Sequence, residues 1–176
     1  PAQKIDSLNL ESLKKRLPAV KGEDRVDLLN EIAARTNFVI AKSKRKDSIF
    51  FYAQKASDEA NKIEYKVGIA MALFNLSYET VQNVSDSVKS SKEEYIRKGM
   101  QLGKETGNNE VLGTGYNLLS GIPSFAKDFE KQSDCYRRSA EYFLKAGDTL
   151  HAAEVTNWLF DLYFNRGKFE DAFDMG

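Results

Sequence analysis

A two-helix phrase recurs along this sequence and constrains its fold more than any other feature. In each copy, a basic residue followed by small residues ends one helix, and a short polar turn leads to a second helix that carries Leu. The copies join Lys55–Ala60 to Asn75-Leu76, Lys98–Gly103 to Asn117-Leu118, and Arg138-Ser139 to Leu159. A recurring helix pair predicts an α-solenoid, because one pair cannot bury its own apolar face without stacked neighbours.

Composition and charge favour a folded binding module over several other classes of protein. Of the 176 residues, 41% are hydrophobic and 30% are charged, which suits a packed core and not a disordered chain. The 26 basic and 26 acidic residues cancel, so no overall field attracts nucleic acid or an anionic membrane. The longest compact apolar run, Ile69–Phe74, falls far short of the roughly 20 residues that span a bilayer. We therefore expect no nucleic-acid partner and no membrane contact by this segment.

Residues suited to catalysis or metal binding are sparse. Cys135 and His151 are each the only residue of their kind, which excludes a disulfide framework and a multi-histidine metal site. Gly113-Thr114-Gly115 begins like a dinucleotide-binding loop, but Leu118 stands at the third glycine position and no strand precedes it. No pair of carboxylates stands out as acid and base. We expect no catalytic residue, no metal and no cofactor.

Helix signals run through the whole chain and no alternating strand pattern occurs, so the sequence predicts an all-α fold. Two of the predicted starts rest on capping residues, Asp47-Ser48 in one case and Ser91 with Glu94 in the other. The expected helices cover residues 6–17, 23–42, 47–63, 65–84, 91–106, 109–120, 128–146 and 149–165, with a last one from Lys168.

A basic run, Lys42, Lys44, Arg45 and Lys46, falls at the junction of two of these helices. We interpret it as a solvated turn, because no aromatic residues are interleaved with the charges. Contact with phosphate or lipid headgroups is the alternative interpretation.

A single domain of stacked helix pairs is expected over residues 1–176. A capping helix at 6–17 precedes repeats at 23–63, 65–106, 109–146 and 149–176, the last of them truncated. Ile32, Leu76, Leu118 and Leu159 are expected at equivalent positions, separated by 44, 42 and 41 residues. A period near 42 exceeds the 34 residues of a tetratricopeptide repeat and is shared by HEAT repeats, so the period alone leaves both open.

The last repeat distinguishes between a tetratricopeptide repeat and a HEAT repeat. Leu159, Tyr163, Gly167, Phe169 and Ala172 follow the order leucine, tyrosine, turn glycine, aromatic and alanine, which resembles the tetratricopeptide signature. The resemblance implies an α-solenoid of helical hairpins wound into a right-handed superhelix, with the period stretched to about 42. It also implies a protein or peptide partner.

Three further segments resemble a narrower group of tetratricopeptide proteins. Residues 24–31, 47–53 and 66–73 are similar to the amino-terminal region of Bacteroidetes sensor histidine kinases and related tetratricopeptide regulators. The similarity implies a periplasmic, non-catalytic sensor domain that follows a signal peptide and precedes a membrane helix with a kinase or DNA-binding module. Such a domain would signal through helix packing or dimerisation. Residues 142–148 suit the alternative, a cytoplasmic adaptor or peptide-responsive regulator.

In the tetratricopeptide family the first helix of each pair lines a concave groove, and the resemblance carries that role to a set of residues here. They are Asp27, Asn30, Ala34, Met71, Phe74, Tyr78, Gly113, Tyr116, Ser120, Glu154, Asn157 and Asp161. The groove would be aromatic in its middle and acidic at one end, without the basic cluster of a carboxylate clamp. Phe74, Tyr78 and Tyr116 are expected to anchor an apolar or extended peptide. For any single aromatic residue, a place in the interhelical core is the favoured alternative.

The end of the last repeat is expected to be apolar and exposed. Trp158, Leu162 and Phe169 lie there, and exposed apolar patches mark interaction surfaces. We expect this end to bind a partner. If the partner is a second copy of the chain, the result is a homodimer.

Overall fold

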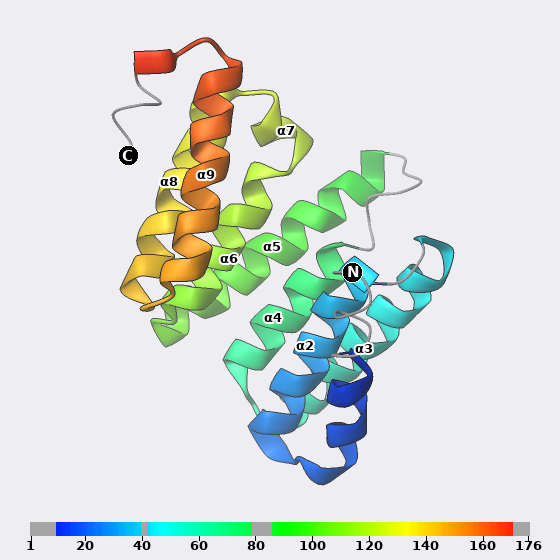
Figure 1. The fold of residues 1–176 in the computed structure, drawn as a ribbon. Coiled ribbons are helices and arrows are strands. Elements are labelled where there is room, and N and C mark those ends of the chain that lie inside the picture. Colours follow the sequence, from blue (N-terminus) through cyan, green and yellow to red (C-terminus); the bar gives the residue numbers. More distant parts are fainter. Residues whose placement is uncertain (1–9, 40–41, 79–85, 171–176) are drawn as a thin grey trace. The chain divides into compact units, whose positions relative to one another are not determined.

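The computed structural model describes residues 10–39, 42–78 and 86–170, and every regular element within these ranges is helical (Figure 1). This finding confirms the predicted all-α class. The chain divides into two compact units, Pro1–Leu102 and Gly103–Gly176.

The first unit is organised around α2, which packs against both α3 and α4. Its elements are η1 (Leu17–Ala19), α2 (Gly22–Val39), α3 (Lys42–Lys62), α4 (Lys66–Ser77) and α5 (Asp86–Thr106) as far as Leu102. Val26, Leu29 and Ile32 recur at helical spacing on α2 and are fully buried. Residues 10–16, which precede η1, are also helical, and their Leu10 and Leu13 join Ile32 in one apolar cluster.

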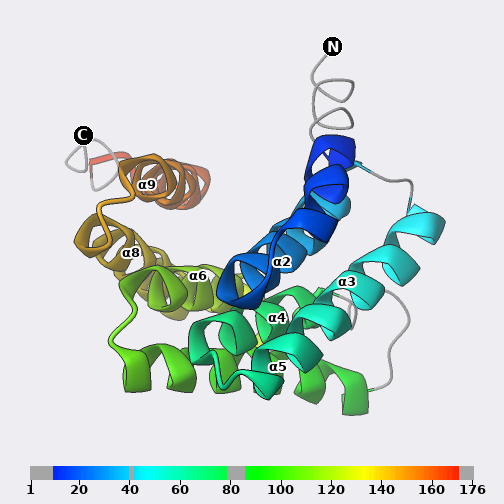
Figure 2. The ribbon, with the colours of Figure 1, turned by 90° about the horizontal axis from the view of Figure 1, so that it is seen from below.

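The second unit is organised around α8, which lies between α6 and α9 (Figures 1 and 2). Its elements after the end of α5 are α6 (Asn109–Ser120), α7 (Pro123–Ala126), α8 (Phe129–Lys145) and α9 (Thr149–Asn165). Phe143 of α8 packs in the core with Ala152 and Val155 of α9.

The sequence located three helices of the second unit to within one residue at each end, α6, α8 and α9. Their starts are marked by side-chain caps, in which Asn108, Asp128 and Asp148 each accept a hydrogen bond from a backbone N–H three residues later. Short α7, which begins at Pro123, was not predicted. The last predicted helix begins with Phe169 and Glu170, and its remainder lies outside the described residues.

Two predicted helix starts were wrong. Helix α3 begins at Lys42, so Asp47-Ser48 lie within the helix and the basic run occupies its first turns, not a loop. Helix α5 begins at Asp86, so Ser91 is also internal. Neither stretch contains Gly or Pro, and a polar capping residue marks a start only where the backbone before it leaves the helical conformation.

One predicted helix end was also wrong. Helix α4 ends at Ser77, not near Val84, and residues 79–85 lie outside the described part of the chain. The Ser77 hydroxyl donates to the carbonyl of Phe74, a local bond that competes with the regular helical ladder. Ser120, the last residue of α6, makes the same bond to Asn117.

The same turn follows α3, α5 and α8. Glu64, Gly107 and Gly147 adopt the left-handed conformation, with φ of 56°, 65° and 78°. The next residue then donates its N–H to a carbonyl five residues back, at N–O distances of 2.9, 3.0 and 2.9 Å. This bond identifies a Schellman motif, which closes a helix and turns the chain back. These three motifs end the second helix of a pair, and α4, α6 and α9 begin two residues after their left-handed residues. The same motif also closes α9, where Gly167 has a φ of 71° and Lys168 donates to the Tyr163 carbonyl at 3.1 Å.

These turns provide a frame for comparing the repeats. Leu76, Leu119 and Leu159 each lie twelve residues after the left-handed residue of the preceding turn, and all three are buried. Leu119 is therefore the counterpart of Leu76, and the predicted equivalence of Leu118 was off by one residue. Single-residue slips are hard to see in the sequence because Leu118 and Leu119 are both apolar and both buried.

Small residues occupy a second equivalent position, eight residues before each left-handed residue. Ala56, Gly99 and Ser139 stand there, each after a Lys or Arg, and all three are buried. Added to Gly99, a Cβ atom would overlap the ring of Phe74 on α4. The Ser139 hydroxyl donates to the carbonyl of Gly113 on α6 at 2.8 Å. The repeated basic-small phrase thus marks a place where a second helix packs closely on a neighbouring first helix.

Replacing Gly99 with Ala should destabilise the first unit. Overpacking a filled core costs about 1–3 kcal/mol, and the better helix propensity of Ala offsets only about 1 kcal/mol of this cost. Denaturant unfolding of purified Gly99→Ala should show a lower free energy of unfolding. Gly121→Ala is the matched control, because the nearest atom to its added Cβ lies at an ordinary contact distance of 3.7 Å. Equal stability of the two variants would contradict the close approach.

The cap of α9 should give acid-sensitive stability. Desolvation raises the pKa of Asp148, but hydrogen bonds from the backbone and imidazole of His151 outweigh it and hold the pKa below the ordinary 3.8. A lowered folded-state pKa means that the stabilisation is complete above the unfolded-state pKa and is lost as pH falls through the folded-state pKa.

Asp148→Asn keeps a capping side chain that does not titrate. The stability difference between the natural protein and this variant should therefore be largest near neutral pH and should shrink below pH 3.8. Chemical denaturation across that range measures the difference, and a constant difference would argue against the titrating cap.

Candidate functional site

Four of the residues predicted to line a groove are buried, three of them with side chains in the core. Asn30 lies on α2, Phe74 on α4 and Ser120 on α6, and each is at most 5% exposed. A partner cannot reach these side chains while the helices stay packed. The other predicted positions are partly or fully exposed, with the exception of Gly113, which is also buried.

Asn30 connects two helices of the first unit. Its side-chain amide donates to the carbonyl of Gly68 at 3.0 Å. The amide of Asn75 on α4 donates in turn to the backbone carbonyl and side-chain oxygen of Asn30, at 3.1 and 3.3 Å. Buried amides that satisfy one another in this way fix the pairing of two helices. Asn75 belongs to the recurring Asn-Leu phrase, so its position was visible in the sequence while its role was not.

Phe74 packs against the backbone of α5 at Gly99, and only 2% of the side chain is exposed. The ring therefore fills the space that the missing glycine side chain leaves. The expected peptide-anchoring role of Phe74 gives way to a packing role.

Tyr116 lies in a row of side chains across α6 and α8. Its ring stacks on that of Tyr142, with centroids 5.6 Å apart, and Arg138 and Lys145 lie over the two rings at 5.6 and 5.1 Å. A hydrogen bond to Tyr116 and an ion pair with Asp134 raise the pKa of Arg138. Tyr116 thus stabilises a contact between two helices of one hairpin.

The turn frame explains why the predicted α6 positions fit poorly. Met71 and Glu154 each lie seven residues after a left-handed residue, whereas the predicted Gly113 lies six after Gly107. The counterparts of Met71, Phe74 and Tyr78 on α6 are therefore Thr114, Asn117 and Gly121. None of these three is buried, as a surface position requires. The predicted set on α6 was displaced by one residue.

The predicted residues of α9 lie on one exposed face. Leu150, Glu154, Asn157, Asp161 and Phe164 follow one another at steps of four, three, four and three residues, which keeps them on one side of a helix. All five are exposed, including 68% of Leu150 and 47% of Phe164. Ala152, Val155 and Leu159 form the buried face of α9. We call the five exposed residues the α9 face. Leu150 and Phe164 were not predicted, although the same spacing reveals them.

In the first unit, the remaining predicted residues differ in their surroundings. Asp27 accepts a hydrogen bond from the Tyr65 hydroxyl at 3.3 Å. Burial and the nearby Glu23 and Asp24 still raise the pKa of Asp27. Ala34 and Met71 are half-buried. Tyr78 at the end of α4 is 39% exposed, while desolvation of its hydroxyl raises its pKa.

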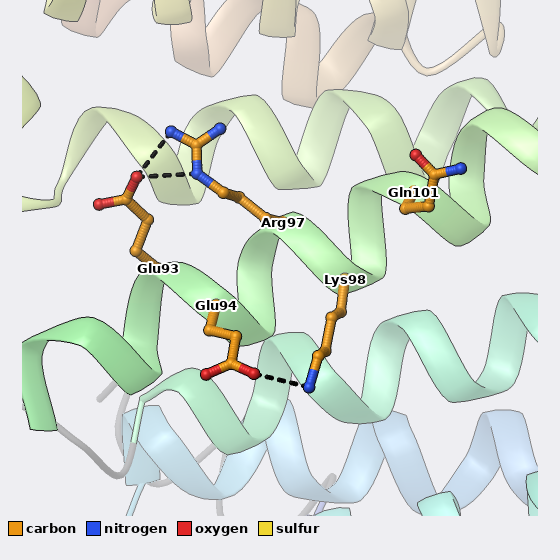
Figure 3. Close-up of a pocket in the computed structure, with 5 residues that line it drawn as sticks. All are labelled: Glu93, Glu94, Arg97, Lys98 and Gln101. Atoms are coloured by element: carbon orange, nitrogen blue, oxygen red, sulfur yellow. Dashed lines mark hydrogen bonds and ion pairs between the residues drawn. The ribbon is translucent and has the colours of Figure 1, made fainter.

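A shallow, open depression lies along α5 (Figure 3). Glu93, Glu94, Arg97, Lys98 and Gln101 line it. Two ion pairs neutralise its charges, Arg97 with Glu93 at 2.6 Å and Lys98 with Glu94 at 2.7 Å. Pairs at this spacing stabilise an exposed helix and leave little net charge to attract a ligand.

The expected exposed end of the last helices is present in the described residues. Trp158 and Phe169 are 43% and 49% exposed, and Leu162 is half-buried. The Phe169 ring meets that of Phe164 edge to face, with centroids 5.0 Å apart. The apolar surface at this end is therefore continuous with one end of the α9 face.

Metal and membrane sites were sought among the described residues. No group of three or more His, Cys, Asp or Glu side chains in this part of the chain is arranged to hold a metal ion. No helix described by the structure is long and apolar enough to cross a membrane.

No family model matches the sequence, and no curated protein matches it either.

Replacing Asn30 with Ala should lower stability. The substitution removes the amide that donates to the Gly68 carbonyl and one of the two acceptors of the Asn75 amide, which keeps its bond to the Asn30 backbone carbonyl. Loss of a buried hydrogen bond of this kind costs about 1 kcal/mol. Asn157→Ala, at an exposed position of α9, should change the free energy of unfolding by no more than about 0.5 kcal/mol. Denaturant unfolding of both variants tests the difference, and a neutral Asn30→Ala would show that the amide pair does not hold α2 to α4.

Proposed function

We propose that this chain is a tetratricopeptide-like interaction domain that binds a protein or peptide through its first helices and catalyses no reaction. The observation that carries the proposal is the α9 face, which exposes Leu150 and Phe164 while the opposite side of the same helix is buried. Exposed apolar side chains that gather together, as Phe164 and Phe169 do at one end of this face, mark an interaction surface. Helical repeats present such surfaces because packing fixes only one side of each helix.

The recurring turns support the assignment to a helical repeat. Glu64, Gly107 and Gly147 are spaced by 43 and 40 residues and are followed by helices that place a buried Leu at the same position. This regularity is typical of repeats that arose from one helix pair. The tetratricopeptide-like signature at Leu159–Ala172 favours that class over HEAT repeats.

We infer further that the domain serves as the input part of a bacterial signalling protein. The resemblance of residues 24–31, 47–53 and 66–73 to sensor kinases and related regulators supports this placement, and a periplasmic location goes with it. Binding would be transmitted through a change in helix packing or through dimerisation. Close contacts such as that of Ser139 with Gly113 make the spacing of paired helices sensitive to such a change.

The gene that encodes the chain tests the signalling assignment. We expect a cleavable signal peptide ahead of Pro1, followed after Gly176 by an apolar span of roughly 20 residues and a kinase or DNA-binding module. More repeats and a stop codon would favour the cytoplasmic adaptor instead.

Tyr78→Ala should weaken partner binding. Partners are first captured from a lysate of the native host on the immobilised chain, identified by mass spectrometry, and their affinity is then measured with purified components. Loss of an aromatic anchor on a first helix should raise Kd about fivefold to thirtyfold. Phe51→Ala is the matched control, because Phe51 is 56% exposed but lies on a second helix.

Equal effects of the two substitutions would contradict a binding surface on the first helices. Failure to capture any specific partner would contradict the proposed function as a whole.

A further inference from the structure

We propose that the α9 face binds a basic, helical segment of a partner protein that carries apolar residues beside its Lys or Arg side chains. This inference rests on the proposed function and names the chemistry of the partner for one surface. It follows from the order of residues along the face, apolar, acidic, amide, acidic and apolar.

The dimensions of the α9 face suit a helical partner. Leu150 and Phe164 are fourteen residues apart, which at 1.5 Å per residue places them about 21 Å apart along the helix. Glu154 and Asp161 are seven residues apart, about 10.5 Å or two turns. A second helix lying alongside α9 repeats the same two-turn spacing, so one Lys or Arg can meet each carboxylate.

The two carboxylates have no cation of their own. Among the described residues, neither Glu154 nor Asp161 forms an ion pair or a hydrogen bond with another side chain. The ion pairs nearest to them involve the ends of the helix, Asp148 with His151 and Lys168 with Glu130. In the depression on α5, by contrast, each carboxylate already holds a basic side chain. Unlike the depression on α5, the α9 face therefore keeps negative charge that a partner can complement.

Charge also excludes other occupants. Nucleic acid and anionic lipid surfaces are repelled by exposed carboxylates, and an acidic peptide would face the same repulsion. A purely apolar segment would cover Glu154 and Asp161 without compensating for their desolvation. A basic segment with apolar residues at both ends complements each residue of the α9 face. When one helix docks alongside another in this way, the contacting residues are three or four apart in sequence.

Trp158 provides a direct reporter for binding at this site. It is the only tryptophan of the chain, it is 43% exposed, and it lies next to Asn157 in the middle of α9. A peptide without aromatic residues can therefore be titrated while the fluorescence of a single protein ring is followed.

The experiment uses the purified chain and two synthetic helical peptides of equal length, one of Lys and Leu and one in which Glu replaces every Lys. The Lys peptide should change Trp158 fluorescence saturably, and the Glu peptide should not. Because the attraction is partly electrostatic, added salt should weaken binding of the Lys peptide.

Paired substitutions locate the interaction. Glu154→Gln with Asp161→Asn removes two exposed ion pairs, each of about 0.2–1 kcal/mol, and should raise Kd for the Lys peptide about twofold to thirtyfold. Glu110→Gln with Glu141→Gln changes the net charge equally on exposed positions of α6 and α8 and should leave Kd almost unchanged.

Three outcomes would overturn the proposal: no fluorescence change with the Lys peptide, equal response to both peptides, or equal weakening by the two paired variants. None of them affects the proposed function, which fails if the chain captures no specific partner or if Tyr78→Ala and Phe51→Ala weaken binding equally. A partner whose binding is lost with Tyr78→Ala but retained with the α9 variants would separate the two proposals.

Discussion

The close approach of helices at one small residue in each repeat is the constraint on which the rest of the structure depends. Ala56, Gly99 and Ser139 occupy the same place relative to the turn that follows them, and each is buried. A larger side chain there would push the neighbouring helix away, as the overlap of an added Cβ on Gly99 with Phe74 illustrates. Once that distance is fixed, the left-handed residues at 64, 107 and 147 direct the chain into the next helix.

This constraint acts on one side of each first helix and leaves the other side free. On α9, Ala152, Val155 and Leu159 pack in the core, whereas the residues of the α9 face lie outside it. On α4, burial extends further round the helix, because Phe74 packs on α5 and Asn75 pairs with Asn30. The two helices share a place in the repeat, yet they offer different amounts of surface for recognition.

The sequence predicted the all-α class and the ends of α6, α8 and α9, because caps and left-handed glycines mark those ends locally. It misplaced the starts of α3 and α5, where a polar residue resembles a cap although helix continues through it. For the candidate site, the resemblance to tetratricopeptide repeats pointed to Glu154, Asn157 and Asp161, which lie on an exposed side of α9. It could not show that Asn30 and Phe74 are buried, since their burial depends on partners 45 and 25 residues away, Asn75 and Gly99.

The division between packed and free sides explains how one repeated unit can present unlike chemistry. A second helix needs a small residue where it packs on a first helix, so few side chains are tolerated at that position. The outward positions of first helices have no such limit. They hold half-buried Met71 on α4 and exposed Tyr78 just after it, but exposed Glu154 and Asp161 on α9. An apolar-aromatic surface and an acidic one select different partners. Under the proposed function, recognition is therefore a property of the individual helix, while stability is a property of the repeat.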